Sequence, residues 1–223
     1  MSKHLQNELE NLNRDLLYIA SLVKENVRKS MVAFYERRVE LAREVIEADE
    51  KIDQKEVQVE EECLKLLALH QPVAQDLRFI AVVMKVNNDL ERMGDSAVGI
   101  ARRAIHIVKE VPCKTPGDLK VMTEKAVKMV DDSLDAFIRK DVEAAKAVSM
   151  ADDEVDVLQK NILKQLRKDM ESDPKTIPSA LDVFTITRRI ERIADYATNI
   201  CEDIIYMVEG NIVRHGYLHK DDA

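Results

Sequence analysis

Residues 90–100 read LERMGDSAVGI and residues 190–200 read IERIADYATNI, and the likeness of these two segments shows how the chain is built. A second pair of segments aligns in the same order: FYERRVELAREVI at residues 34–46 and FIRKDVEAAKAVS at residues 137–149. Repeats have to be identified before single motifs are interpreted, because each copy is one structural unit. The sequence therefore predicts a duplicated protein.

Apolar residues recur every three or four positions in each copy, which is the pattern of a helix with one buried face. The first stripe of this kind consists of Leu5, Leu9, Leu12, Leu16, Ile19 and Val23. A later stripe runs from Leu77 to Ala104 and is interrupted by Asn87. The presence of only five Gly and five Pro in 223 residues also favours long helices.

Most helix breaks are marked by proline, because a proline inside a helix loses a backbone hydrogen bond and clashes with the preceding turn. The prolines are Pro72, Pro112, Pro116, Pro174 and Pro178. The first break, near residues 35–38, contains neither Gly nor Pro. Asp141 is a good N-cap for the helix that follows it, whereas Arg38 at the matching position is a poor one. Gly210 follows the last periodic residue as a C-cap.

These patterns predict an all-α fold of two tandem three-helix bundles with six long helices. Residues 1–111 form the first predicted bundle, residues 117–210 the second, and residues 211–223 a C-terminal tail. The three cysteines are odd in number and widely spaced, so neither a disulfide framework nor a thiolate zinc site is expected. Cys63 and Cys201 fall on apolar helix faces, which predicts buried thiols.

Charge and hydropathy exclude several classes of protein. Lys+Arg 34 against Asp+Glu 42 gives a formal net charge of −8, whereas a general nucleic-acid binder needs a basic face. The longest uncharged apolar run, residues 79–84, is far shorter than a membrane span. Residues 1–13 lack the apolar core of a signal peptide. We expect a soluble, cytoplasmic protein that does not bind nucleic acid.

Acidic residues paired four positions apart are the main candidate functional feature. One helical turn separates the members of a pair, so both side chains point from one face and could hold a hard cation. The candidate metal ligands are Asp49, Asp53, Glu91 and Asp95 in the first copy, and Asp152, Asp156, Glu191 and Asp195 in the second. Pairs at this spacing also arise by chance in an acidic chain. Their recurrence in both copies is what distinguishes these eight.

Helical geometry places the pairs on the surface. At about 100° per residue, Glu91 and Asp95 point roughly 160° away from the stripe that contains Met93. We therefore expect grooves between helices in which the repulsion among carboxylates is offset by a cation or by Lys and Arg. Oxygen-only ligands suit magnesium, calcium, manganese or iron better than zinc. Iron is the expected metal, with zinc, manganese or magnesium as alternatives.

Sequence signatures of catalysis are missing. The chain contains no GxxxxGK[ST] loop, no GxGxxG loop and no GxSxG elbow. His4, His70 and His106 have no partner at ligand spacing, whereas His215 and His219 lie four apart in the expected tail. We assign no catalytic residue and no organic cofactor, and expect the protein not to be an enzyme. A metal-dependent hydrolase that uses the carboxylates and a metal-free helical scaffold are the alternatives.

Residues 71–97, QPVAQDLRFIAVVMKVNNDLERMGDSA, closely resemble the signature of the PhoU family, which comprises bacterial regulators of phosphate signalling. IPSALDVFTITRRIERIADYATNI at residues 177–200 resembles the second repeat of the same family. VIEADEKID at residues 45–53 and VSMADDEVD at residues 148–156 resemble its middle helices. The resemblance covers nearly the whole chain.

This resemblance implies a cytoplasmic, often dimeric protein of two three-helix bundles that restrains phosphate uptake and the phosphate-starvation response. Its implied partners are the ATPase subunit of the phosphate ABC transporter and the phosphate-sensing histidine kinase, and it would reach the membrane only through them. Some family members bind metal-ion clusters through paired acid-x-x-x-Asp motifs. Those motifs fall on the eight acidic residues named above.

Overall fold

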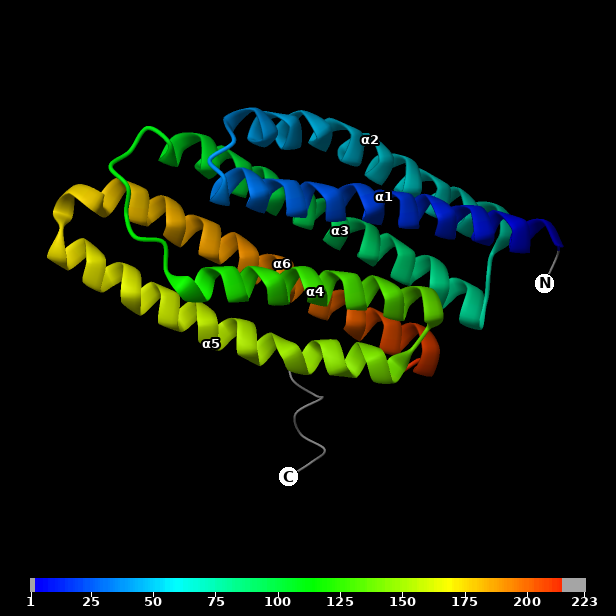
Figure 1. Ribbon diagram of the computed structural model, residues 1–223. Coiled ribbons are helices and arrows are strands. Elements are labelled where there is room, and N and C mark those ends of the chain that lie inside the picture. The colour runs from blue at the N-terminus through cyan, green and yellow to red at the C-terminus, as the bar shows by residue number, and fades with distance from the viewer. Residues whose placement is uncertain (1–2, 214–223) are drawn as a thin grey trace, which may run out of the picture.

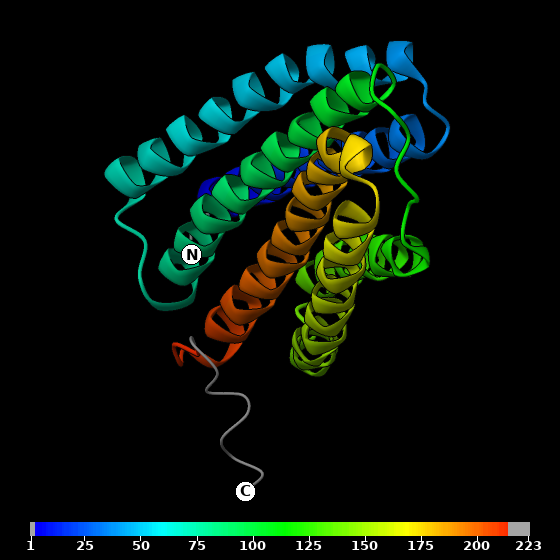
Figure 2. The same cartoon turned by 90° about the vertical axis from the view of Figure 1, so that its left-hand side faces the viewer.

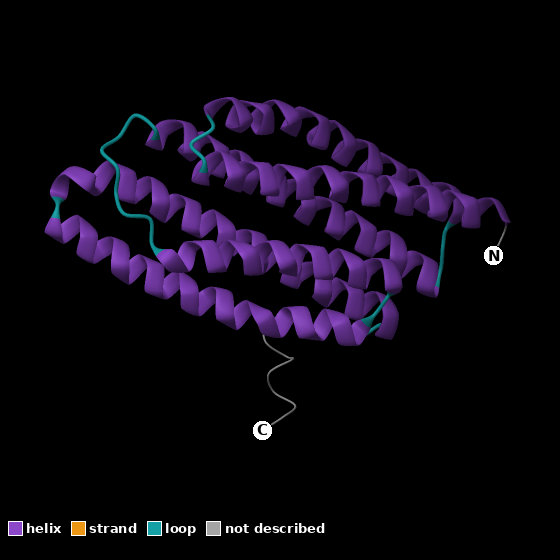
Figure 3. Ribbon diagram, in the orientation of Figure 1, coloured by secondary structure: helices purple, strands orange, loops and turns teal. Residues whose placement is uncertain are grey.

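The computed structural model describes residues 3–213, and every regular element in that range is helical (Figure 3). The six long helices are α1 (Lys3–Tyr35), α2 (Val39–His70), α3 (Ala74–Ile107), α4 (Gly117–Arg139), α5 (Val142–Ser172) and α6 (Ile177–Glu209). A short 3-10 helix, η1 (Pro174–Thr176), precedes α6. The predicted all-α fold with six long helices is confirmed. His215, His219 and most of the expected tail lie outside the described residues.

The first helix of each copy ends in the same kind of turn. Arg37 and Lys140 occupy matching positions and both adopt the left-handed conformation, with φ of 53° and 52°. In each turn the next residue closes back on the helix: the backbone N–H of Arg38 donates at 2.9 Å and that of Asp141 at 3.0 Å to the carbonyl five residues earlier. Both turns therefore reverse the chain without Gly or Pro.

The predicted caps and breaks are confirmed. The Asp141 carboxylate accepts a hydrogen bond from the backbone N–H of Ala144 at 3.0 Å, whereas Arg38 makes no side-chain cap. Gly210 ends α6 in the left-handed region, with φ of 78°. The five prolines all lie in connections or in the first turn of a helical element.

The two halves are joined along α3 and α6. These helices lie side by side in the middle of the molecule and make the most extensive contact of any helix pair (Figures 1 and 2). Helices α1 and α2 pack on α3, and helices α4 and α5 pack on α6. The buried apolar residues form one cluster with members from all six helices. No helix within residues 3–213 is long and apolar enough to cross a membrane.

Some individual positions differ from the sequence pattern. Leu77 was placed in a buried stripe but is 44% exposed, because it lies in the first turn of α3 next to the connection. Asn87 does not break its stripe: it is buried, and its side-chain Nδ2 donates to the backbone carbonyl of Glu56 on α2 at 2.9 Å.

Cys63 and Cys201 are buried as predicted, and burial raises the pKa of each thiol to about 12.

Candidate functional site

The eight candidate acids lie on two pairs of packed helices. Helices α2 and α3 carry the pairs at residues 49/53 and 91/95, and α5 and α6 carry the pairs at residues 152/156 and 191/195. All eight side chains are half-buried or exposed, and none belongs to the apolar core. We call the first set the α2–α3 acidic cluster and the second set the α5–α6 acidic cluster.

In the α2–α3 acidic cluster, carboxylates on one helix raise the pKa values of carboxylates on the other. Burial, followed by the charges of Asp53 and Asp95, raises the pKa of Asp49 to about 6. Burial and the charges of Asp95 and Asp53 also raise the pKa of Glu91. Arg102 acts in the opposite direction on Asp49, but burial and the acidic neighbours outweigh it. Arg92 likewise lowers the pKa of Glu91 without reversing its rise, so negative charge in the cluster is only partly compensated.

The α5–α6 acidic cluster repeats this arrangement. Burial, then Glu191 and Asp152, raises the pKa of Asp195 to about 7. The pKa of Asp152 rises to about 6 from burial and from the nearby acids, of which Asp156 has the largest effect. Asp156 has a cationic partner, Lys160, at 3.4 Å on the same helix.

A glycine lets the first cluster form close to the α3 backbone. A Cβ placed on Gly94 would lie 3.2 Å from Oδ1 of Asp49, which is tighter than an ordinary contact. The missing side chain allows the Asp49 carboxylate to approach α3 beside the pair at residues 91/95. Ala194 occupies the matching position in the second copy, so the two clusters differ at this contact.

The chemistry of both clusters fits a hard cation, because all ligands are carboxylate oxygens and a bound cation would relieve their repulsion. In the described part of the chain, however, the group of three side chains whose ligand atoms all lie within 4.8 Å of one another is His4, Glu8 and His70. No three of the eight acids, each offering one carboxylate oxygen, meet this 4.8 Å criterion. The acids of each cluster are therefore neighbours, but their oxygens are not arranged as a preformed ligand set. The expectation that His4 and His70 lack a partner at ligand spacing is wrong, since Glu8 lies between them.

A chain of two tandem three-helix units with acidic pairs on the second and third helix of each unit belongs to the class of duplicated helical bundles. The family model described as "PhoU domain" matches residues 16–104 and residues 119–204. The chain belongs to the PhoU family. The predicted boundaries at residues 111, 117 and 210 enclose the two matched segments and stay a prediction.

Relatives resemble the chain over nearly its full length. A PhoU homolog from Aquifex aeolicus, named a phosphate-specific transport system accessory protein, is 41% identical over 97% of this chain and 98% of its own. The Escherichia coli protein of that name is 34% identical over 96% of this chain and 91% of its own. The crystal structure of PhoU from Pseudomonas aeruginosa is 38% identical, with a TM-score of 0.89 over 92% of this chain and 99% of that one.

Proposed function

We propose that this protein is a non-enzymatic accessory regulator of phosphate transport, which restrains phosphate uptake and the phosphate-starvation response. The observation that carries the proposal is its similarity, over nearly the whole chain, to relatives named as accessory proteins of the phosphate-specific transport system. The shared fold supports the same role, because both halves of the duplicated bundle are retained.

The regulator is proposed to act in the cytoplasm, as a homodimer, between two partners. These are the ATPase subunit of the phosphate ABC transporter and the phosphate-sensing histidine kinase, and the protein reaches the membrane only through them. The resemblance of residues 71–97 and 177–200 to the family's repeats supports this assignment.

The two acidic clusters are proposed to bind metal ions, iron first, with zinc, manganese or magnesium as alternatives. The oxygen-only ligand sets support this proposal, as do the raised pKa values of Asp49, Asp152 and Asp195. A bound ion would supply positive charge that holds α2 against α3 and α5 against α6. Within the α2–α3 acidic cluster, the absence of a side chain at Gly94 lets the Asp49 carboxylate lie close to α3.

Capture experiments test the adaptor role. The immobilised protein should retain the transporter ATPase subunit and the kinase from phosphate-replete extracts, and Glu91→Ala/Asp95→Ala should weaken the capture. Glu40→Ala/Glu44→Ala is the matched control, because these two acids are also four apart on α2 but lie outside the clusters. Failure to capture either partner would overturn the adaptor proposal.

Elemental analysis of untagged protein, purified without chelator or nickel resin, tests the metal proposal. Several ions per chain in the wild type, and fewer in Glu91→Ala/Asp95→Ala, are expected. No loss of metal in the variant would remove the α2–α3 acidic cluster from consideration. Phosphoester turnover in the presence of manganese or iron, abolished by Glu91→Ala, would instead favour the hydrolase.

A further inference from the structure

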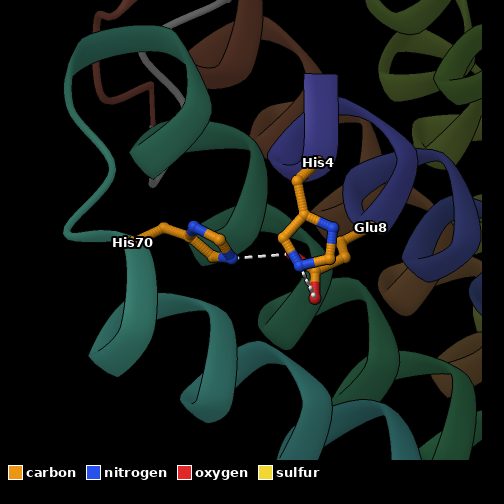
Figure 4. Close-up of side chains that lie close together, drawn as sticks. All are labelled: His4, Glu8 and His70. Atoms are coloured by element: carbon orange, nitrogen blue, oxygen red, sulfur yellow. Dashed lines mark hydrogen bonds and ion pairs between the residues drawn. The ribbon is translucent and has the colours of Figure 1, made fainter. Parts of the chain in front are cut away.

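Three potential metal ligands meet where α1 begins and α2 ends (Figure 4). His4 and Glu8 lie one turn apart on α1, and His70 is the last residue of α2. Nε2 of His70 lies 2.6 Å from Oε2 of Glu8, and Nε2 of His4 lies 3.6 Å from Oε1 of the same carboxylate. The two imidazole rings meet edge to face, with centroids 5.6 Å apart.

Helix packing largely buries the side chains of Glu8 and His70, whereas the side chain of His4 is exposed to solvent. Helices α1 and α2 pack against each other, and the left-handed C-cap at Gln71 ends α2 directly after His70. The side chains of Glu8 and His70 are only 15% and 18% exposed, whereas that of His4 is 74% exposed. The group is therefore ordered on its inner side and open to solvent at His4.

We propose that His4, Glu8 and His70 form a binding site for a divalent transition metal of the Zn²⁺ type. Two imidazole nitrogens and one carboxylate oxygen are a known zinc ligand set that leaves one coordination position open. Imidazole ligands favour Zn²⁺, Cu²⁺ or Ni²⁺ over Mg²⁺ and Ca²⁺. This preference separates the site from the oxygen-only acidic clusters, and the inference does not depend on the proposed function.

The observed distances suit this assignment. Ligand atoms around a tetrahedral Zn²⁺ lie roughly 3.4 Å apart, given metal–ligand bonds of about 2.0–2.1 Å. His70 lies 2.6 Å from Oε2 of Glu8 and His4 lies 3.6 Å from Oε1, the other oxygen of that carboxylate. One ligand atom from each of the three residues lies within 4.8 Å of the other two, so small side-chain movements would bring them to that separation. The ion would replace the hydrogen bond between His70 and Glu8. Because His4 is exposed, its ring can adjust to complete the set.

The site belongs to the first copy alone. Helix α1 has 33 residues whereas α4 has 23, so the second copy lacks the early turns that carry His4 and Glu8. One ion per chain is therefore expected at this site. That ion would fasten the first turns of α1 to the last residue of α2, and so close one end of the first bundle.

Metal titration of the full-length chain tests the proposal. The parent variant carries Asp49→Ala/Asp53→Ala/Glu91→Ala/Asp95→Ala, Asp152→Ala/Asp156→Ala/Glu191→Ala/Asp195→Ala and His215→Ala/His219→Ala, so that neither the acidic clusters nor the tail histidines contribute. Zn²⁺ binding is followed by calorimetry, and Co²⁺ binding by the visible absorption that distinguishes a low-coordinate nitrogen-containing site. The parent should bind one ion per chain.

Three single changes in the parent decide the result. His4→Ala and His70→Ala should each weaken Zn²⁺ binding by at least about tenfold, because even indirect support of a metal ligand contributes that much. His106→Ala should leave binding unchanged; this histidine also contacts carboxylates, those of Asp182 and Glu110, but lies at another site. Circular dichroism checks the fold, and His4 is exposed enough to be removed without disturbing it.

Two outcomes overturn the proposal. Zn²⁺ affinity in His4→Ala equal to that of the parent would leave only the His70–Glu8 ion pair. An equal loss in His106→Ala would show non-specific binding. Since the acidic clusters are absent from every variant, neither outcome bears on the metal sites of the proposed function.

Discussion

The contact between Gly94 and Asp49 gives a prediction about a single residue. Gly94→Val should lower the free energy of unfolding by about 1–3 kcal/mol, because an overpacked buried position forces its neighbours to move. The added Cβ would meet both the Asp49 carboxylate at 3.2 Å and Ile52 at 3.5 Å. Urea denaturation measures the change. Gly117→Ala is the control: apart from its chain neighbours and the adjacent backbone of α4, no heavy atom lies within 4 Å of its Cβ position, so it should shift stability by at most about 0.5 kcal/mol.

A buried carboxylate between α3 and α6 gives a second prediction. Asp182 on α6 is almost fully buried, and it accepts hydrogen bonds from His106 at 2.6 Å and Arg103 at 3.3 Å, both on α3. Asp182→Asn should cost about 1.5–3 kcal/mol of unfolding free energy, since hydrogen bonds to charged groups contribute that much. Asp132→Asn, which removes an exposed ion pair with Lys128, should cost less than about 1 kcal/mol. Equal costs would contradict this interpretation.

At the residue scale, spacing predicted which side chains share a helix face, but not which distant residues meet. His4 and Glu8 are four apart, and two helices of similar length joined by a short turn bring residue 70 beside them. The four-residue spacing and the matched helix lengths together could have predicted that His4, Glu8 and His70 meet. Considering each histidine alone missed this group. Asn87 was misleading for a related reason: its hydrogen-bond acceptor lies on another helix, which the spacing of one helix does not reveal.

The matching turns between helices give an element-scale prediction, because only one of them is capped. Asp141→Ala should destabilise the protein by about 0.5–2 kcal/mol by removing the N-cap of α5. Arg38→Asp should stabilise it by about 1 kcal/mol by supplying the missing cap of α2. The ion pair lost with Arg38, to Glu36 at 3.6 Å, is exposed and contributes little. Thermal unfolding of both variants tests this; a loss in both would contradict it.

The acidic clusters predict how stability depends on pH in the metal-free protein. The pKa values of Asp49, Asp152 and Asp195 are raised from 3.8 to about 6–7 in the folded chain. Between pH 4 and 7 the folded state therefore binds more protons than the unfolded state, so stability falls as the pH rises. The Tm at pH 5 should exceed that at pH 8 by about 3 °C or more.

A substitution isolates the contribution of these acids. Asp195→Asn should raise the Tm at pH 8 and reduce the difference between pH 5 and pH 8, because it removes a charge that is unfavourable in the folded state. Glu40→Gln, at an exposed position of α2 outside the clusters, should leave the difference unchanged. A Tm that rises with pH in the metal-free wild type would contradict the assignment.

At the element scale the sequence was highly informative. Prolines marked three of the connections between the long helices, and the N-cap at Asp141 marked a fourth. The first break, inferred near residues 35–38, is where α1 ends and α2 begins. The left-handed conformations of Arg37 and Lys140 could not be predicted, because neither residue type favours a positive φ. The eight acids were assigned to helices correctly, but the separation of their oxygens depends on packing between helices.

At the scale of the whole molecule, the continuous core predicts cooperative unfolding of both halves. Urea denaturation should give one transition that coincides in far-UV circular dichroism and tyrosine fluorescence. Tyrosines report on both halves, since Tyr18 and Tyr35 lie in α1 whereas Tyr196 and Tyr206 lie in α6. Two separated transitions would show that residues 1–111 and 117–210 are independent domains.

The contact between α3 and α6 also bears on how such a chain arises. The two helices are equivalent members of the two copies, and contact between equivalent surfaces is the geometry by which identical subunits form a symmetric dimer. The connection from Ile107 to Gly117 turns that association into an intramolecular one, at an effective concentration on the order of millimolar for a short flexible linker. Once the partners share one chain, each can change without the other. Gly94 in one copy where the other has Ala194, and the histidine pair of His4 and His70 in the first copy, are the differences that such freedom permits.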